Sequence, residues 1–339
     1  MQSQFDFDVD KLAQYLEAQV VGFKGPLKAE KFAGGQSNPT FKIITAGGDY
    51  VLRRKPPGEL LKSAHAVDRE YRVLAALADT DVPVAEVYHL CEDDSIIGSM
   101  FYLMEYKQGR VFWDPALPDM SNIQRGEIFD QMNRVLVALH SVDIDAVGLQ
   151  DYGRPGNYFA RQIGRWTKQY QASEIDTIAD MDRLIEWLPE NTPEDDGKLV
   201  LAHGDFRLDN MMFHATESQP IALLDWELST LGHPYADLAY QCMQLRLEND
   251  CVLAGLGGID RQKLGIPSEE EYVALYCQRM GIESIPNWNF YVIFSMFRFA
   301  AILEGVGQRA LGGNASSDKA GQMRELVKPL AKMAVEMIV

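Results

Sequence analysis

The pattern of apolar residues changes near residue 105, and this change constrains the fold more than any other feature of the chain. Before it, short β-rich runs at residues 40–45 and 48–54 flank Gly47 and Gly48, as in a hairpin. Apolar residues at positions 67, 71, 74 and 77 then follow a helical spacing. After residue 105 helical patterns dominate. We therefore expect an α+β protein with a β-rich domain over residues 1–105 and a mainly helical domain over 106–339.

Several helices can be placed in the second part of the chain. One is expected between residues 122 and 143, where five apolar residues share a face, and another from Ser268, whose partner Glu271 completes a capping box before a stop at Gly281. The last two helices are expected over residues 287–311 and 317–339. The one clear β signal in this part is the pair of short runs around a polar turn at residues 211–226.

Charge and composition disfavour several classes of partner. The net charge is −17 and the pI about 4.8, which disfavours a nucleic acid or an anionic membrane surface as partner. The apolar run at residues 290–306 contains Arg298 and Glu304, so we expect a buried helix there and no membrane contact. The four scattered cysteines form no metal motif, and the acidic N-terminus is no signal peptide, so we expect a cytoplasmic protein.

The run LAHGDFRLDNMMF, residues 201–213, places polar side chains inside an apolar stretch. Asp205 and Asn210 lie five positions apart, and Asp225 follows at the end of the next β-rich run. Phosphoryl transfer from ATP needs a carboxylate to accept the proton of a hydroxyl, together with oxygen ligands for Mg²⁺. These three residues supply that set, with Asp205 as the base and the other two as metal ligands.

This order of motifs resembles the protein-kinase-like fold, and the form HGD followed by DWE resembles its aminoglycoside phosphotransferase and choline kinase branch. The fuller wording HGDFRLDN…LLDWELSTLGHPYADLAY is most similar to the kinase-like domains that accompany acyl-CoA dehydrogenases. The similarity extends from about residue 30 onward. It implies a two-lobe protein with a β-rich N-lobe and a helical C-lobe, and ATP and Mg²⁺ as cofactors.

The resemblance also assigns residues to the nucleotide. The loop FAGGQSNPTFKI would cover the phosphates, and the arginine at the position of the family's lysine, Arg53, would bind them with Glu70 as its partner. Whether Arg53 fully replaces that lysine, or Arg54 or Lys55 serves instead, is left open. The junction between the lobes would contact adenine. The assigned residues are Gly34, Gly35, Ser37 and Asn38 in the loop, Arg53 and Glu70, and Glu105 and Tyr106 at the junction.

Four residues near the motif receive roles by the same resemblance. Arg207 would stabilise the charge of the transferred phosphoryl group, or else brace the loop. Glu227 would either support a second metal ion or act indirectly, through contacts with the ligands of the first. His203 would be a structural histidine, and Asp237 would brace the backbone of the loop.

The expected function is transfer of the γ-phosphate of ATP to a hydroxyl of a small molecule, with a hydroxy acid or hydroxyacyl thioester among the candidates. An aminoglycoside or choline-like kinase, and an inactive nucleotide-binding relative, are the alternatives. A protein kinase is disfavoured, since Asp237 follows Asp225 by only twelve residues. Basic residues at helical spacing, Arg161, Arg165 and Lys168, favour an anionic acceptor. The acceptor's identity, the number of metal ions and the oligomeric state are left open.

Overall fold

The computed structural model describes residues 7–32, 38–56, 66–154, 156–311 and 320–338. Two compact units make up the chain. Unit 1 comprises Met1–Gly109 with Ile221–Glu227, and unit 2 comprises Arg110–Pro220 with Leu228–Val339. The sequence placed a single boundary at residues 105 and 106, and it did not anticipate that the short segment carrying Asp225 joins the N-terminal unit.

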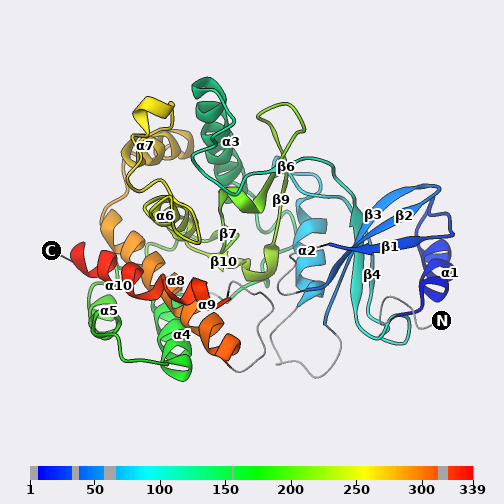
Figure 1. Cartoon of the computed structure of the whole chain (residues 1–339), viewed down its shortest axis with the longest axis horizontal. Helices are drawn as coiled ribbons and strands as arrows, with labels where there is room; N and C mark the ends of the chain where they lie inside the picture. The colour runs from blue at the N-terminus through cyan, green and yellow to red at the C-terminus, as the bar shows by residue number, and fades with distance from the viewer. Residues whose placement is uncertain (1–6, 33–37, 57–65, 155, 312–319, 339) are drawn as a thin grey trace. The chain divides into compact units, whose positions relative to one another are not determined.

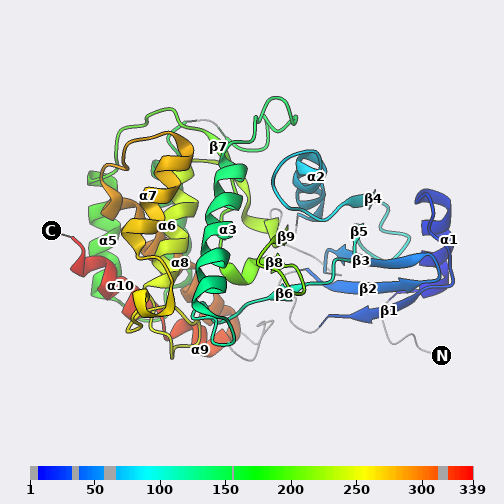
Figure 2. The same ribbon diagram turned by 90° about the horizontal axis from the view of Figure 1, so that it is seen from above.

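Unit 1 is built on a five-stranded antiparallel sheet with the strand order β1-β2-β3-β5-β4. The hairpin expected around Gly47 and Gly48 is confirmed, because β2 pairs with β3 from Thr40↔Arg53 to Thr45↔Gly48. Figure 2 shows α2 to one side of these strands. The elements are α1 Val9–Gln19, β1 Lys28–Lys31, β2 Thr40–Thr45, β3 Gly48–Arg54, α2 Val67–Leu77, β4 Val87–Cys91 and β5 Phe101–Glu105.

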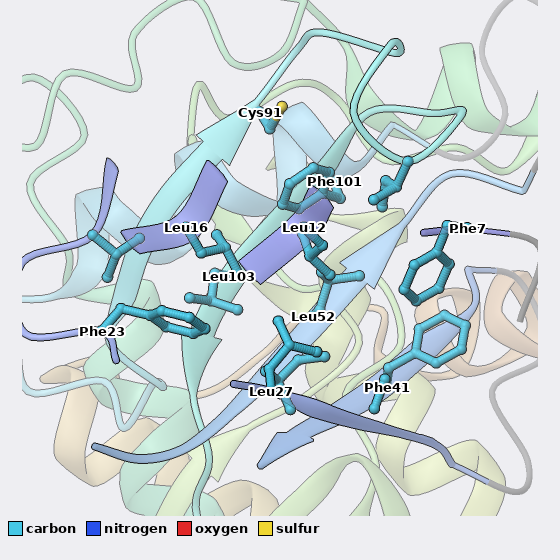
Figure 3. Packing of buried hydrophobic residues seen from close by; sticks show 14 residues of the cluster. Phe7, Leu12, Leu16, Phe23, Leu27, Phe41, Leu52, Cys91, Phe101 and Leu103 are labelled. Carbon is cyan, nitrogen blue, oxygen red and sulfur yellow. The ribbon is translucent and has the colours of Figure 1, made fainter. Parts of the chain in front are cut away.

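The alternation of side chains along β3 decides what its two arginines do. Leu52 faces the apolar core that α1 closes with Leu12 and Leu16 (Figure 3). Arg54, two residues on, lies on the same side, is buried, and holds its guanidinium over the rings of Phe7 and Phe41. Successive residues of a strand point to opposite faces, so Arg53 points to the other side of the sheet, where α2 lies.

Unit 2 is mainly helical, as the sequence predicted, and α8 is its central element. This helix packs against α4, α6, α9 and α10 (Figure 1), and nearly all its residues from Phe290 to Gly305 are buried. The helices are α3 Asn122–His140, α4 Tyr158–Ser173, α5 Ala179–Glu190, α6 Pro234–Leu245, α7 Glu269–Met280, α8 Trp288–Leu311, α9 Ala320–Arg324 and α10 Val327–Glu336.

One helix in the described part of the chain, α8, is long and apolar enough to cross a membrane by length and composition alone. Within the protein 89% of its most apolar stretch is buried. The sequence prediction of a buried helix at residues 290–306 is thus confirmed by packing against its neighbours.

The two β-rich runs expected at residues 211–226 are present as β8 Met211–Phe213 and β9 Pro220–Leu223, and the turn between them is closed by the hydrogen bond from His214 N–H to Gln219 O. Three further strands were missed: β6 Arg110–Val111, β7 Val200–Ala202 and β10 Thr230–Gly232. Each has only two or three residues, too few to show an alternating pattern. The antiparallel partners are β6 with β8, and β7 with β10.

The capping box of α7 is confirmed, with both Ser268 and Glu271 bonded as predicted, and Gly281 ends the helix in the left-handed conformation. The prediction of one helix over residues 317–339 is wrong in its described part, which forms α9 and α10. Pro329 is the third residue of α10, and proline fits the first turn of a helix but breaks a helix interior.

Candidate active site

The loop that follows β7 carries the HGD motif, and a buried aspartate fixes its backbone. Asp237, on α6, accepts hydrogen bonds from the N–H groups of His203 at 2.6 Å and Gly204 at 2.8 Å, so its predicted bracing role is confirmed. Gly204 has φ +83°, and a Cβ there would lie 2.5 Å from Leu228 O. Only glycine fits that position. His203 is fully buried, in keeping with a structural role.

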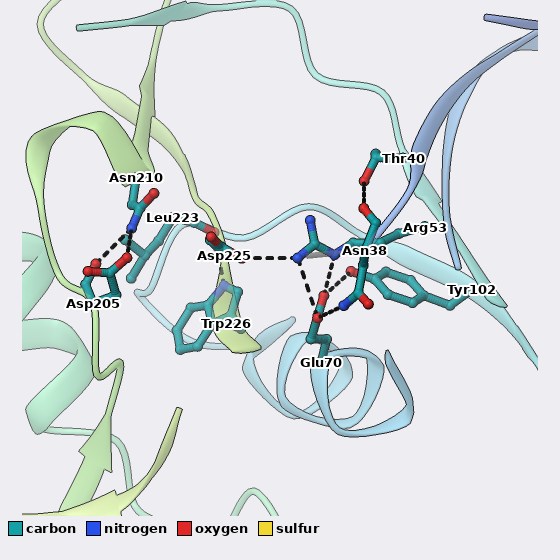
Figure 4. A network of polar contacts seen from close by, with 10 residues as sticks. All are labelled: Asn38, Thr40, Arg53, Glu70, Tyr102, Asp205, Asn210, Leu223, Asp225 and Trp226. Atoms are coloured by element: carbon teal, nitrogen blue, oxygen red, sulfur yellow. Dashed lines mark hydrogen bonds and ion pairs between the residues drawn. The ribbon is translucent and has the colours of Figure 1, made fainter. Parts of the chain in front are cut away.

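Asp205 and Asn210 form one hydrogen-bonded unit within this loop (Figure 4). The side-chain amide of Asn210 donates to the backbone oxygen and to the carboxylate Oδ2 of Asp205, both at 2.8 Å. Because both partners are acceptors, the nitrogen of the amide must face Asp205 and its oxygen Oδ1 must face the other way. The loop therefore orients the carboxylate and presents a hard oxygen ligand at the same time.

The surroundings of Asp205 keep its carboxylate ionised. Burial opposes ionisation, but the Arg207 guanidinium, a hydrogen bond from Tyr240 and the Asn210 amide outweigh it and lower the pKa of Asp205. Arg207 Nε lies 3.5 Å from Asp205 Oδ1, and its Nη2 lies 2.8 Å from Asp209 Oδ2. Arg207 thus braces the loop between two carboxylates.

The sequence analysis assigned no role at the site to two residues that lie around Asp205. Tyr240 lies three positions after Asp237 on α6 and bonds to Asp205. Arg298 lies on α8, and its Nη2 donates to Gly204 O at 2.5 Å while its guanidinium lies over the Tyr240 ring. The signals that could have found them are the i, i+3 spacing on α6 and a lone arginine inside the apolar run of α8.

Unit 1 gathers a second polar group on the α2 side of the sheet (Figure 4). Arg53 Nε lies 2.6 Å from Glu70 Oε2, and Arg53 Nη2 lies 3.0 Å from Asp225 Oδ1. Glu70 also accepts hydrogen bonds from Tyr102 Oη at 3.1 Å and from the Asn38 amide at 2.8 Å. The sequence prediction that Arg53 pairs with Glu70 is confirmed.

Arg54 and Lys55 do not reach this group. Arg54 donates to Ile97 O on the opposite face of the sheet, and Lys55 Nζ lies 3.6 Å from Asp68. Of the three basic residues that the sequence left open, Arg53 is the one in contact with Glu70.

Burial and neighbouring charges shift the pKa values of Arg53 and Glu70 in the unit 1 group. Burial disfavours the charge of Arg53, but Glu70, Asp225 and Glu227 together raise the pKa of its guanidinium. Burial raises the pKa of Glu70, and the nearby Asp225 adds to this, while Arg53 opposes both. Three carboxylates, those of Glu70, Asp225 and Glu227, therefore act on one cation in this group.

The backbone at Asp225 is in an unusual conformation for an aspartate, with φ +62°. Such left-handed residues are uncommon outside glycine and concentrate at functional sites. Asp225 has 39% of its side chain exposed, and Glu227, two positions on, is exposed as well. These carboxylates are thus accessible from solvent.

The residues predicted for Mg²⁺ fit a hard cation in their chemistry. Asn210 presents an amide oxygen, and Asp225 an accessible carboxylate. Mg²⁺ takes one or two protein oxygens, with phosphates and water completing its shell. Across the described residues no cluster of three or more His, Cys, Asp or Glu could hold a metal by itself.

The remaining residues predicted to bind the nucleotide are Glu105, Tyr106 and those of the glycine-containing loop. Glu105 ends β5, and its N–H already donates to Glu86 O at 2.8 Å, so it has no free donor for adenine. The Tyr106 ring lies 4.1 Å from Lys42 Nζ. Gly34, Gly35 and Ser37 lie outside the described residues, whereas Asn38 is fully buried and bonded to Glu70.

Comparison with solved structures defines the class of protein. A Ralstonia eutropha protein provisionally described as an aminoglycoside phosphotransferase is 51% identical, with 98% of each chain covered and a TM-score of 0.89. The aminoglycoside phosphotransferase APH(4)-Ia, in a ternary complex with ADP and hygromycin B, is 14% identical with a TM-score of 0.64, covering 96% of this chain and 98% of the other, so it shows a shared fold. The fold is the kinase-like α+β fold that the sequence predicted.

The chain belongs to the phosphotransferase enzyme family, whose profile matches residues 28–269. Acyl-CoA dehydrogenase family member 10 of Mus musculus is 49% identical over 96% of this chain but only 30% of its own length. The chain therefore spans less than a third of that relative. The resemblance to the kinase-like domains that accompany acyl-CoA dehydrogenases is confirmed.

Proposed function

We propose that this protein transfers the γ-phosphate of ATP to a hydroxyl group of a small molecule. The observation that carries the proposal is the Asp205–Asn210 unit, in which one amide orients a carboxylate and leaves its own oxygen facing away, where it could bind a metal ion. A non-catalytic relative has no need for that double arrangement. The related fold that binds ADP and hygromycin B supports a nucleotide and a small acceptor as ligands.

Each residue group would have a separate task. Arg53, held by Glu70, would bind the ATP phosphates, and Asn210 and Asp225 would hold Mg²⁺, which when bound neutralises charge on those phosphates. Asp205 would accept a hydrogen bond from the acceptor hydroxyl and take its proton as the new O–P bond forms, while the bond from the γ-phosphorus to the bridging oxygen breaks and ADP leaves. With its lowered pKa, Asp205 remains ionised at neutral pH and so is ready to accept that bond.

Arg207 would act mainly on Asp205. A contact with the γ-phosphate would compete with its 2.8 Å ion pair to Asp209, whereas its place beside Asp205 already stabilises the carboxylate. Glu227 would act electrostatically on the residues that bind the nucleotide, since its charge acts on Arg53.

The acceptor would be a small neutral or anionic alcohol, such as a hydroxy acid or a hydroxyacyl thioester. Support comes from the relative that joins this kind of domain to an acyl-CoA dehydrogenase. An ATP-consumption screen across aminoglycosides, amino alcohols, hydroxy acids and hydroxyacyl-CoAs tests the proposal. Turnover only with kanamycin or choline would favour the alternative kinases, and ATP binding without turnover of any acceptor would favour an inactive relative.

A further inference from the structure

Two arginines of unit 2 lie around one indole ring. The guanidinium carbon of Arg165, on α4, is 5.1 Å from the ring centroid of Trp166, and that of Arg298, on α8, is 5.6 Å from the same centroid. The sequence pointed instead to a stripe of three residues on α4. Arg161, the first residue of that stripe, donates to Gly156 O just before the helix.

Neither arginine of this pair has an acidic partner. In the part of the chain that the structure describes, no carboxylate lies within ion-pair distance of Arg165 or Arg298. Other arginines of unit 2 do have such partners, as in the pair of Arg246 with Glu269 and that of Arg324 with Glu304. The chain has 49 acidic and 32 basic residues, yet these two neighbouring arginines have no carboxylate partner among the described residues.

The surroundings of the pair do not compensate its positive charge. Partial desolvation, together with the charge of Arg298, lowers the pKa of Arg165. Arg298 is only 4% exposed, and its buried Nε has no hydrogen-bond partner among the described residues. A buried cation that lacks a counter-charge is costly, and an anion that binds nearby would reduce that cost.

The pair lies beside the catalytic loop of the same unit. Arg298 donates to Gly204 O, one residue before Asp205, and lies over the ring of Tyr240, which bonds to Asp205. Arg165 is exposed on α4, so its guanidinium is accessible to a ligand. A ligand whose anionic group binds Arg165 would thus approach the loop from the side of α4 and α8.

We propose that Arg165 and Arg298 form an anion-binding site for the acceptor, with Arg165 contacting a carboxylate or phosphate group and Arg298 supporting it electrostatically from within the core. The role of this site depends on the proposed function, because the bound anion would be part of the acceptor whose hydroxyl reaches Asp205. It selects hydroxylated anions and repels polycations such as aminoglycosides.

Binding without ATP is the first test. The melting temperatures of the wild type, Arg165→Gln and the matched control Lys168→Gln are compared in 3-hydroxybutyrate, inorganic phosphate and coenzyme A, at constant ionic strength. Lys168 is exposed on the same helix, three residues on. We expect at least one anion to raise the melting temperature of the wild type and of Lys168→Gln by about 2 °C more than that of Arg165→Gln. The 3-hydroxybutyrate arm detects a carboxylate site, and the other two arms a phosphate site.

Equal shifts in all three proteins, with every anion, would overturn the site. An anion that also binds at Arg53 shifts all three proteins alike, so only the difference between variants counts.

Acceptor kinetics form the second test. With an acceptor found by the ATP-consumption screen, Arg165→Gln should raise the acceptor KM about tenfold and leave the ATP KM unchanged, while Lys168→Gln changes neither. Arg165-dependent anion binding without turnover of any acceptor would support the site and refute the proposed function. Turnover with an unchanged acceptor KM in Arg165→Gln would refute the site and leave the proposed function standing.

Discussion

Arg53 and Asp225 stand 172 positions apart in the chain and form an ion pair in unit 1, with Arg53 Nη2 3.0 Å from Asp225 Oδ1. The same nitrogen lies 3.4 Å from Glu70 Oε1, so a single guanidinium bridges two acids. Proposed nucleotide and metal ligands are thus paired with each other, and Mg·ATP would exchange these contacts for phosphate on Arg53 and metal on Asp225.

Of the two neighbouring arginines of β3, Arg53 should support ATP binding and Arg54 the stability of the fold. Arg53→Ala should raise the ATP KM about tenfold or more, because it removes a charged contact to the phosphates. Arg54→Ala should instead lower the free energy of unfolding by about 2–4 kcal/mol, because it removes a buried side chain and its aromatic contacts. Steady-state kinetics and denaturant melts of both variants check this, and a larger ATP KM in Arg54→Ala would contradict the assignment.

Asp205→Asn should fold normally and bind ATP with unchanged affinity while its turnover falls by roughly 10²–10⁴-fold, the usual contribution of a positioned base. Asparagine retains the shape of the side chain and an oxygen for the Asn210 amide, so the loop should persist. Nucleotide titration calorimetry provides the control for binding. Wild-type turnover in this variant would remove Asp205 from the reaction.

ATP should stabilise the protein more with Mg²⁺ than with EDTA, because Mg²⁺ held by the proposed ligands would add to the contacts of the phosphates. At a concentration of Mg·ATP one hundred times its Kd, the gain is about 2.7 kcal/mol. Asp225→Ala should abolish most of the difference between Mg²⁺ and EDTA. Identical melting curves of the wild type under both conditions would show that the nucleotide site has been assigned wrongly.

His233 should make stability fall as the pH drops from 7 to 5. Its Nδ1 accepts the N–H of Tyr235 at the start of α6, and burial lowers its pKa from 6.5 in spite of the nearby Asp196. As the pH falls, the unfolded chain therefore takes up this proton before the folded protein does, and stability is lost below pH 6.5. His233→Asn retains a capping acceptor without this proton, and its stability should fall less over the same range.

Denaturant melts at pH 7 and 5 measure the effect. His233→Ala serves as the control for the cap and should cost about 1 kcal/mol at pH 7. If the wild type and His233→Asn lose the same stability between the two pH values, the predicted role of His233 is wrong.

Features set by a few neighbouring residues could be predicted from the sequence. The capping box of Ser268 and Glu271 involves bonds that span three residues, and the hairpin of β2 and β3 needs only two β-rich runs and a glycine turn. Strands β7 and β10 could not be predicted, because three residues carry no periodic signal, and their pairing is made by segments about thirty positions apart.

The sequence by itself determined which groups can carry the chemistry: the HGD loop, the asparagine five positions after its aspartate, and the aspartate that follows the hairpin. Only the tertiary structure decided how they are oriented and supported. Tyr240 and Arg298 reach the loop from α6 and α8, and Arg53 meets Asp225. Local spacing is encoded by the geometry of the backbone, whereas contacts between distant elements arise only when their apolar faces pack, and packing sets which polar side chains are buried together.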